Sequence, residues 1–272
     1  MIAACEWIFG RRPLEETLGV LREAGVDGLE VSGEPKRDAG ALAERLAEAG
    51  LRGSGTTAVC NWPTEDRDLA HSEREARRHA VVYYRGCVDL AAMVGARVVG
   101  LIPAAVGRLD VLTSYEREWR FAAEGLREVA LYAGERGVRV AVEPINRYET
   151  HLVNRVEQAL ELAAQADVDG VGVIADVFHM QLEERDSAAA LELAGASLAA
   201  LHVADSNRLG LGRGQLPLAP LLEAARALGF NGPFVLECTA PGPNPFRADK
   251  GPGPMAELDR FVHESAAALR RS

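Results

Sequence analysis

The chain has 272 residues and a formal net charge of −10 at pH 7, with 48% apolar and 26% charged residues. This composition fits a soluble protein with a large core. Proteins that bind nucleic acid or anionic membranes usually present clustered Lys and Arg, so the acidic balance argues against both partners.

The four cysteines are Cys5, Cys60, Cys87 and Cys238, and none forms a CxxC pair. A chain of this size does not need disulfides, so we expect free thiols in a reducing cytoplasm. The first residues lack the basic-then-apolar order of a signal peptide. No apolar run approaches the roughly 18 residues that a membrane span needs.

Short apolar runs alternate with longer amphipathic segments along the whole chain. The near-continuous runs at 96–103, 138–144, 170–176 and 234–238 are typical of parallel strands buried on both faces. Between such runs, apolar residues recur at spacings of three and four, as on one face of a helix. The predicted strands begin at Ile2, Gly28, Arg52, Arg97, Val138, Val171, Ala200 and Phe234.

Eight such units, with no linker between them, predict a single (β/α)8 barrel domain over residues 1–272. Glycines such as Gly25 and Gly95 mark the helix ends that precede strands. An open doubly wound sheet is the alternative, but residues 7–13 (WIFGRRP) lack the glycine-rich phosphate turn of that fold. The long segment 58–71 is either an active-site cover or an ordinary surface excursion.

Ionisable side chains stand at the ends of the last four predicted strands: Glu143, Asp176, His202 and Glu237. The carboxyl ends of barrel strands meet at one rim, where barrel enzymes keep their active sites. Three carboxylates and one imidazole suit Mn, Mg or Co and tolerate Zn. Without a cation, such acids would repel one another and lose hydration. The pattern therefore predicts a divalent-metal site.

Each of these residues has a structural interpretation when it is taken alone. A Glu at a strand end can be a solvated cap, Asp176 can cap a helix, and His202 can be a core residue. Four matching residues on four successive strands make these separate interpretations less probable together. The remaining histidines lie in predicted helices or loops and are interpreted as surface residues: His71, His79, His151 and His263.

Three motifs and a short closing phrase resemble one known family. They are VEPINRYETHLVN (142–154), IADVFHMQLEE (174–184), LHVADSNRLGLGRGQ (201–215) and VLEC (235–238). Together they resemble the xylose isomerase-like TIM barrel superfamily, and within it the ketose 3-epimerase branch. That branch includes D-tagatose and D-psicose 3-epimerases and keto-sugar-acid epimerases.

The resemblance implies roles for seven residues. Glu143, Asp176, His202 and Glu237 would bind one divalent metal. Manganese is the first expectation, with cobalt, magnesium and zinc as alternatives. Glu149, His179 and Arg208 would contact the substrate.

The implied activity is inversion of the carbon next to the ketone (C3) of a ketose or keto-sugar acid, through an enediolate. Glu143 and Glu237 would act as paired acid and base, one for each face of the substrate. The resemblance also implies a homo-oligomer, either dimer or tetramer.

Several features depart from the pattern of the branch or have no assigned role. Cys238 stands where many sugar epimerases have proline, and the Pro- and Gly-rich segment 241–254 is expected over the barrel mouth. Trp7 and Phe9 are either pocket walls or core residues. Glu30, expected at the end of the second strand, receives no role.

Other activities remain as alternatives. Hydroxypyruvate isomerases share the DVFHMQ type of phrase, and inosose isomerases or dehydratases belong to the same superfamily. An endonuclease IV-like abasic-site nuclease would need extra metal ligands that the third and fourth strands lack. A non-catalytic sugar-binding barrel is the remaining alternative, against which the paired glutamates argue.

Overall fold

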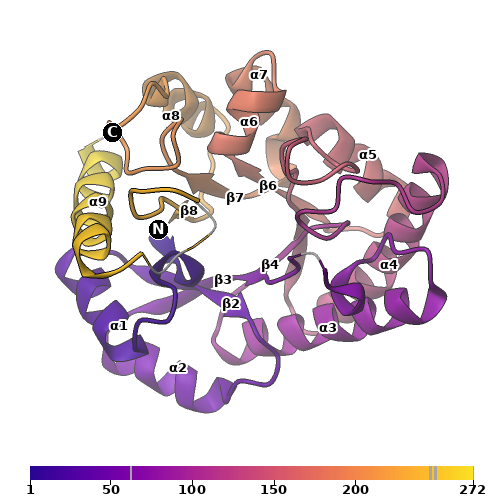
Figure 1. The fold of residues 1–272 in the computed structure, drawn as a ribbon, viewed down its shortest axis with the longest axis horizontal. Coiled ribbons are helices and arrows are strands. Elements are labelled where there is room, and N and C mark those ends of the chain that lie inside the picture. The colour runs from indigo at the N-terminus through magenta and orange to yellow at the C-terminus, as the bar shows by residue number, and fades with distance from the viewer. Residues whose placement is uncertain (62, 245–246, 248–249, 272) are drawn as a thin grey trace.

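Eight parallel strands close into one barrel, in which each strand pairs with the next along the chain and β1 pairs with β8 (Figure 1). This computed structural model describes residues 1–61, 63–244, 247 and 250–271. The strands are β1 (Ile2–Cys5), β2 (Gly28–Gly33), β3 (Arg52–Ala58), β4 (Val98–Leu101), β5 (Arg139–Val142), β6 (Gly172–Asp176), β7 (Leu198–Val203) and β8 (Phe234–Leu236). The (β/α)8 fold predicted from the sequence is confirmed, and the open sheet is excluded.

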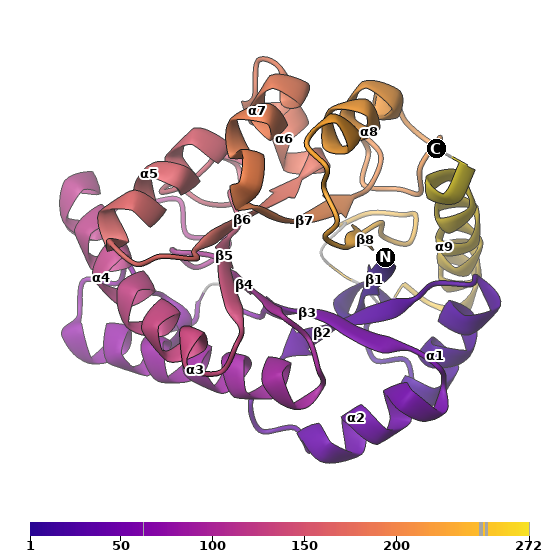
Figure 2. The same ribbon diagram turned by 180° about the vertical axis from the view of Figure 1, so that it is seen from behind.

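Helices surround the barrel in a ring (Figure 2). They are α1 (Leu14–Glu23), α2 (Ala39–Glu48), α3 (Arg74–Met93), α4 (Tyr115–Gly134), α5 (Val156–Ala166), α6 (Val177–Glu183), α7 (Ser187–Ala194), α8 (Leu218–Ala227) and α9 (Pro252–Arg271). The described residues also form the short 3-10 helices η1 (Glu6–Phe9), η2 (Glu65–Arg67) and η3 (Gly195–Ser197). In the part of the chain that the structure describes, no helix is both long and apolar enough to cross a membrane.

Burial on both sides explains why the strands are nearly continuous apolar runs. All four residues of β4 are buried, and so are all six of β7. The helices bury only one face, as Tyr84 and Val88 of α3 illustrate. The glycine after a helix adopts positive φ, for example 66° at Gly25 and 73° at Gly95, a conformation that lets the chain turn directly into the next strand.

Four predicted strand starts differ from the structure by one or two residues. The strands expected at Arg97, Val138 and Val171 each begin one residue later. The strand expected at Ala200 begins two residues earlier, at Leu198. The predicted start misses Leu198 and Ala199, because alanine has low strand propensity and no β-branched residue marks this end of β7.

Two histidines that the sequence places on the surface are largely enclosed, so that prediction is wrong for them. His71 is 6% exposed, and its Nδ1 accepts a hydrogen bond from the Glu73 backbone N–H. The His151 side chain is 8% exposed and contacts Glu118, with 2.9 Å between Nε2 and Oε2. His71 bonds to a residue two positions away and His151 to one 33 positions away, and neither contact leaves a periodic signal in the sequence.

A buried ionic cluster joins the loop after β3 to the loop after β4 and to α4. The guanidinium of Arg108 contacts Asp68 and Glu118, both at 2.7 Å. All three side chains are at most 2% exposed. The same loop is tied to the one after β5, because the Gly107 N–H donates to the backbone oxygen of Glu149 at 2.6 Å.

The segments 58–71 and 241–254, which the sequence places near the barrel mouth, each contain residues outside the described ranges. In the segment 58–71, η2 packs against α3, Leu69 is buried, and Trp62 lies outside the described residues. In the segment 241–254, residues 245, 246, 248 and 249 lie outside the described residues. A covering role for either loop stays a prediction.

Replacing Arg108 by Met tests the buried ionic cluster. The change leaves two buried carboxylates without their cation, so we expect a loss of about 3–5 kcal/mol in the free energy of unfolding. Arg260→Met is the matched control, because Arg260 and its partner Glu257 are 54% and 49% exposed and such surface pairs contribute about 0–1 kcal/mol. Urea unfolding at pH 7 measures both, and equal losses would contradict the assignment.

Candidate metal centre at the carboxyl ends of the strands

The last four strands carry one ionisable side chain each to the same end of the barrel. Asp176 is the final residue of β6, and its Cα pairs with that of His202 in β7. Glu143 and Glu237 follow β5 and β8 directly. Their backbone N–H groups continue the ladder by donating to Leu101 O and Val203 O, both at 3.0 Å. Regular sheet pairing therefore fixes the height of all four side chains on the rim.

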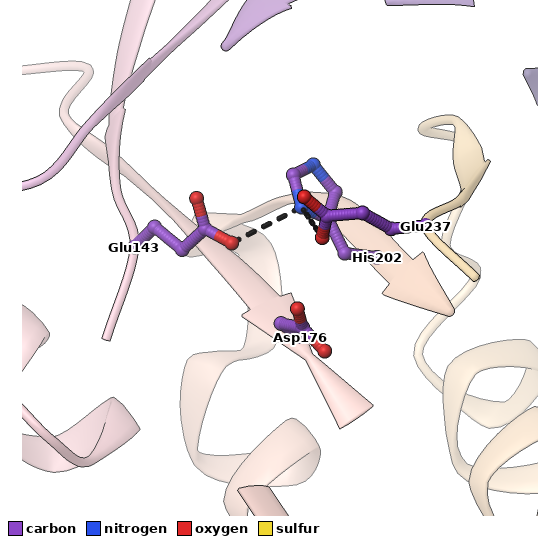
Figure 3. Close-up of side chains that lie close together, drawn as sticks. All are labelled: Glu143, Asp176, His202 and Glu237. Atoms are coloured by element: carbon purple, nitrogen blue, oxygen red, sulfur yellow. Dashed lines mark hydrogen bonds and ion pairs between the residues drawn. The ribbon is translucent and has the colours of Figure 1, made fainter. Parts of the chain in front are cut away.

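These four side chains converge on a common space (Figure 3). Each offers one ligand atom, and these atoms all lie within 4.8 Å of one another. His202 Nδ1 stands between two carboxylates, 3.1 Å from Glu143 Oε1 and 3.0 Å from Glu237 Oε2. All four residues are buried, so the predicted set is brought together, while their role as ligands stays a prediction.

Burial and the neighbouring charges shift the pKa values of the groups in this site. Burial raises the pKa of Glu143 to about 7, opposed by His202 and reinforced by the charges of Glu237 and Asp176. Burial alone would lower the pKa of His202, but the carboxylates of Glu30, Glu143 and Glu237 hold it well above its usual value. Negative charge therefore dominates the cluster and attracts protons or cations.

Arg208 supplies a fixed positive charge beside the cluster. It lies in the loop after β7 with φ of 62°, which is uncommon for a residue other than glycine. Its guanidinium contacts Asp176 Oδ2 at 2.6 Å and Glu237 Oε2 at 2.8 Å, and lies 4.7 Å from the centre of the Phe178 ring. Although burial opposes ionisation of Asp176, Arg208 and the nearby histidines lower the pKa of that carboxyl.

His179 and Glu149, both predicted to contact substrate, lie next to this cluster. His179 Nε2 is 3.5 Å from Asp176 Oδ2, and its Nδ1 is 3.9 Å from Glu149 Oε1. Burial lowers the pKa of His179 to about 4, so its ring is neutral at pH 7. Burial also raises the pKa of Glu149.

Asn146 joins these two side chains and received no role from the sequence. Its Nδ2 lies 2.7 Å from His179 Nδ1 and donates to Glu149 Oε1 at 2.6 Å. A neutral imidazole that accepts at Nδ1 carries its proton on Nε2, which here faces Asp176. Asn146 lies three residues before Glu149 in the loop after β5, and this closeness in the sequence could have indicated that the two side chains interact.

Trp7 and Glu30 make two further contacts with the cluster. Trp7 Nε1 donates to Glu237 Oε1 at 2.6 Å, while Phe9 is buried in the core. Glu30 of β2 faces the other side of the His202 ring, with 3.2 Å between Oε1 and Nε2. The sequence leaves Trp7 as a pocket wall or a core residue, and the structure shows that its indole also donates a hydrogen bond to the cluster.

A cavity of about 1030 Å³ lies at the opposite end of the barrel. Its lining includes the first residues of β3, β4, β5 and β7, at the amino ends of the strands. None of the predicted site residues borders it. Barrel enzymes carry out their chemistry at the carboxyl ends of the strands, so the rim cluster is the better candidate for an active site.

The donor set fits a divalent cation. Three carboxylates and one imidazole match the oxygen-rich ligands that Mn and Mg prefer and that Co and Zn accept. Within residues 1–61, 63–244, 247 and 250–271, this is the only group of three or more His, Cys, Asp or Glu side chains close enough to share an ion. A three-metal centre of the nuclease type would require further groups of this kind.

Comparison with known proteins agrees with the fold and points to epimerases. The family described as xylose isomerase-like TIM barrel matches residues 18–258. L-Ribulose 3-epimerase of Mesorhizobium japonicum is 31% identical over 80% of this chain and 72% of its own. 3-Dehydro-D-guloside 4-epimerase of Escherichia coli is 28% identical, over 82% and 86% of the two chains. A solved L-ribulose 3-epimerase superposes with a TM-score of 0.85 at 26% identity, covering 99% and 95%.

Binding of Mn²⁺ should stabilise the folded protein. At a free concentration 100 times the dissociation constant, a ligand of the native state adds about 2.7 kcal/mol to the free energy of unfolding. For a chain of this size we expect Tm to rise by roughly 5–10 °C, and EDTA to reverse the rise. Differential scanning calorimetry measures both effects.

Two substitutions place that stabilisation at the rim. Asp176→Asn should remove most of the Mn²⁺-dependent rise in Tm because it weakens one ligand. Asp169→Asn, on an exposed residue at the opposite end of the barrel, should leave the rise intact. An equal rise in the unaltered protein and in the Asp176 variant would contradict the site.

Proposed function

We propose, since the chain belongs to the xylose isomerase-like TIM barrel family, that it is a metal-dependent epimerase of a ketose or keto-sugar acid. The reaction is inversion of the carbon next to the ketone. Two relatives support this reaction class, because the names 3-epimerase for a ribulose and 4-epimerase for a 3-dehydro sugar both place inversion beside the carbonyl. One divalent cation is part of the proposal, with manganese first and cobalt, magnesium or zinc as alternatives.

The placement of Glu143 and Glu237 carries the proposal. The two carboxylates approach the centre from opposite sides, from β5 and β8, with His202 between them (Figure 3). Inversion requires that a proton leave one face of a carbon and that another arrive on the opposite face. Two carboxylates on opposite sides can each serve one face, as base and as acid.

The remaining side chains would hold the substrate and its developing charge. When bound by Glu143, Asp176, His202 and Glu237, the cation would supply positive charge for the substrate oxygens next to the carbon that loses its proton. Glu149 and the Nε2 proton of His179 lie beside this centre and can bind substrate hydroxyl or carbonyl oxygens. Arg208 adds a buried guanidinium that can bind an oxygen and keeps Asp176 ionised.

Transfer of the carbonyl to a neighbouring carbon is the second candidate, as in a hydroxypyruvate or inosose isomerase. The same rim can serve it, because one base on one face suffices. The pose of the substrate relative to Glu143 and Glu237 separates the two outcomes. A nuclease with three metals would need further groups of metal ligands, and the described residues offer none. The paired glutamates argue against a purely sugar-binding role.

The test is proton exchange in deuterated water with Mn²⁺ present. D-Fructose, D-psicose, D-tagatose, L-ribulose, a keto-sugar acid and hydroxypyruvate form the panel. We expect deuterium at the carbon next to the ketone together with inversion there, seen by NMR and chromatography. An aldehyde product from hydroxypyruvate would favour the second candidate, and no exchange with any carbonyl compound would contradict the enzyme proposal.

Glu143→Gln and Glu237→Gln test the acid–base pair. With the best substrate and saturating Mn²⁺, kcat should fall by about 10²–10⁴-fold in each variant, while circular dichroism stays unchanged. Glu16→Gln, an exposed change on α1, is the control and should retain full kcat. Full activity in both site variants would refute the assigned roles.

Two further proposals concern the state of the protein. Assembly into a dimer or tetramer stays a prediction from the resemblance, and light scattering coupled to gel filtration tests it. A cytoplasmic location likewise stays a prediction from the sequence, which fractionation of the source cells would test.

A further inference from the structure

Glu30 is a buried carboxylate that the proposed reaction does not use. It is the third residue of β2, and only 1% of it is exposed. Its side chain lies inside the barrel and contacts His202, which is 172 residues away along the chain. A carboxylate buried this deeply requires a compensating interaction, so its partners indicate its purpose.

The two ring nitrogens of His202 face different groups. Nδ1 faces the metal cluster, at 3.0–3.1 Å from Glu237 and Glu143. Nε2 faces Glu30 Oε1 at 3.2 Å. An ionised carboxylate only accepts hydrogen bonds, and a neutral imidazole has one donor and one acceptor nitrogen. A histidine that binds a metal must be neutral, and in the neutral ring Glu30 accepts from Nε2–H and leaves the free lone pair on Nδ1.

The surroundings of Glu30 fix its carboxylate in place. The Thr57 hydroxyl, from β3, donates to Glu30 Oε2. Cys5 of β1 lies behind Thr57, with 3.6 Å between Sγ and Oγ1. Gly55 leaves the room that Glu30 occupies, because a Cβ there would stand 2.9 Å from Oε1. Residues from β1 and β3, the two strands that flank β2, thus hold the carboxylate against His202.

We propose that Glu30 is a positioning residue that holds the His202 ring with Nδ1 toward the cluster and thereby sets the affinity for the divalent cation. The inference rests on the proposed metal site. In metal proteins, a carboxylate that accepts from the second nitrogen of a histidine ligand fixes the tautomer and raises the basicity of the ligand. Glu30 would do so from the side of the barrel opposite the ligands on β5 and β6.

Substitutions of Glu30 test the proposal through Mn²⁺ binding. Glu30→Gln keeps an acceptor oxygen but loses the charge, and we expect its Kd for Mn²⁺ to rise by about 10-fold. Glu30→Met loses both and should raise Kd by up to about 100-fold, as for other such partners. Thr57→Val, which removes a donor to Glu30, should show a smaller rise in the same direction. Isothermal titration calorimetry measures each Kd.

A matched control separates positioning from the general cost of removing a buried acid. Glu118 is as deeply buried as Glu30 but belongs to the Arg108 cluster. Glu118→Gln is therefore expected to reduce stability while leaving Kd for Mn²⁺ unchanged. Equal losses of affinity in the Glu30 and Glu118 variants would show a structural effect and overturn the inference.

The unaltered protein offers a direct readout that needs no variant of Glu30 to fold. In ¹⁵N-histidine NMR with diamagnetic Mg²⁺, the His202 signal, assigned with His202→Gln, should show a proton on Nε2 and none on Nδ1. A proton on Nδ1 would overturn the inference, as would unchanged Kd in folded Glu30 variants. Absence of Mn²⁺ binding by the unaltered protein would overturn the metal site itself, and with it this role of Glu30.

Discussion

The barrel buries three carboxylates close together at one end. Their oxygens lie within 4.8 Å of one another and of an imidazole nitrogen, and the rest of the site depends on how this negative charge is balanced. Like charges at such distances, away from water, oppose folding unless positive charge balances them. Arg208 supplies part of that balance through Asp176 and Glu237. A divalent cation would supply the remainder. The clustered carboxylates that oppose folding would then also hold the ion that acts on a carbonyl compound.

The closed sheet holds these side chains in place. Backbone pairing places Asp176 level with His202 and continues one residue past β5 and β8 to fix Glu143 and Glu237. The site therefore does not depend on loops for its shape. Loops contribute the adjacent polar groups instead. Asn146 and Glu149 come from the segment after β5, which is tied to Gly107 and through its loop to the buried Arg108 cluster.

Much of this arrangement is predictable because it follows from short-range patterns. Apolar runs mark the strands, and an acid directly after such a run marks the rim, which identifies Glu143 and Glu237. Glu30 received no role because nothing near it in the sequence indicates its partner, His202, which lies 172 residues away. The enclosure of His151 was missed in the same way, since it depends on Glu118. The early start of β7 was hidden by two alanines, whose burial comes from barrel closure and not from side-chain type.

Anomalous X-ray scattering at the manganese edge, from crystals grown with Mn²⁺, tests the central claim most directly. The account predicts one strong peak bounded by Glu143, Asp176, His202 and Glu237, with His202 presenting Nδ1 to the ion. A peak elsewhere in the barrel, or no peak at the rim at saturating Mn²⁺, would contradict it.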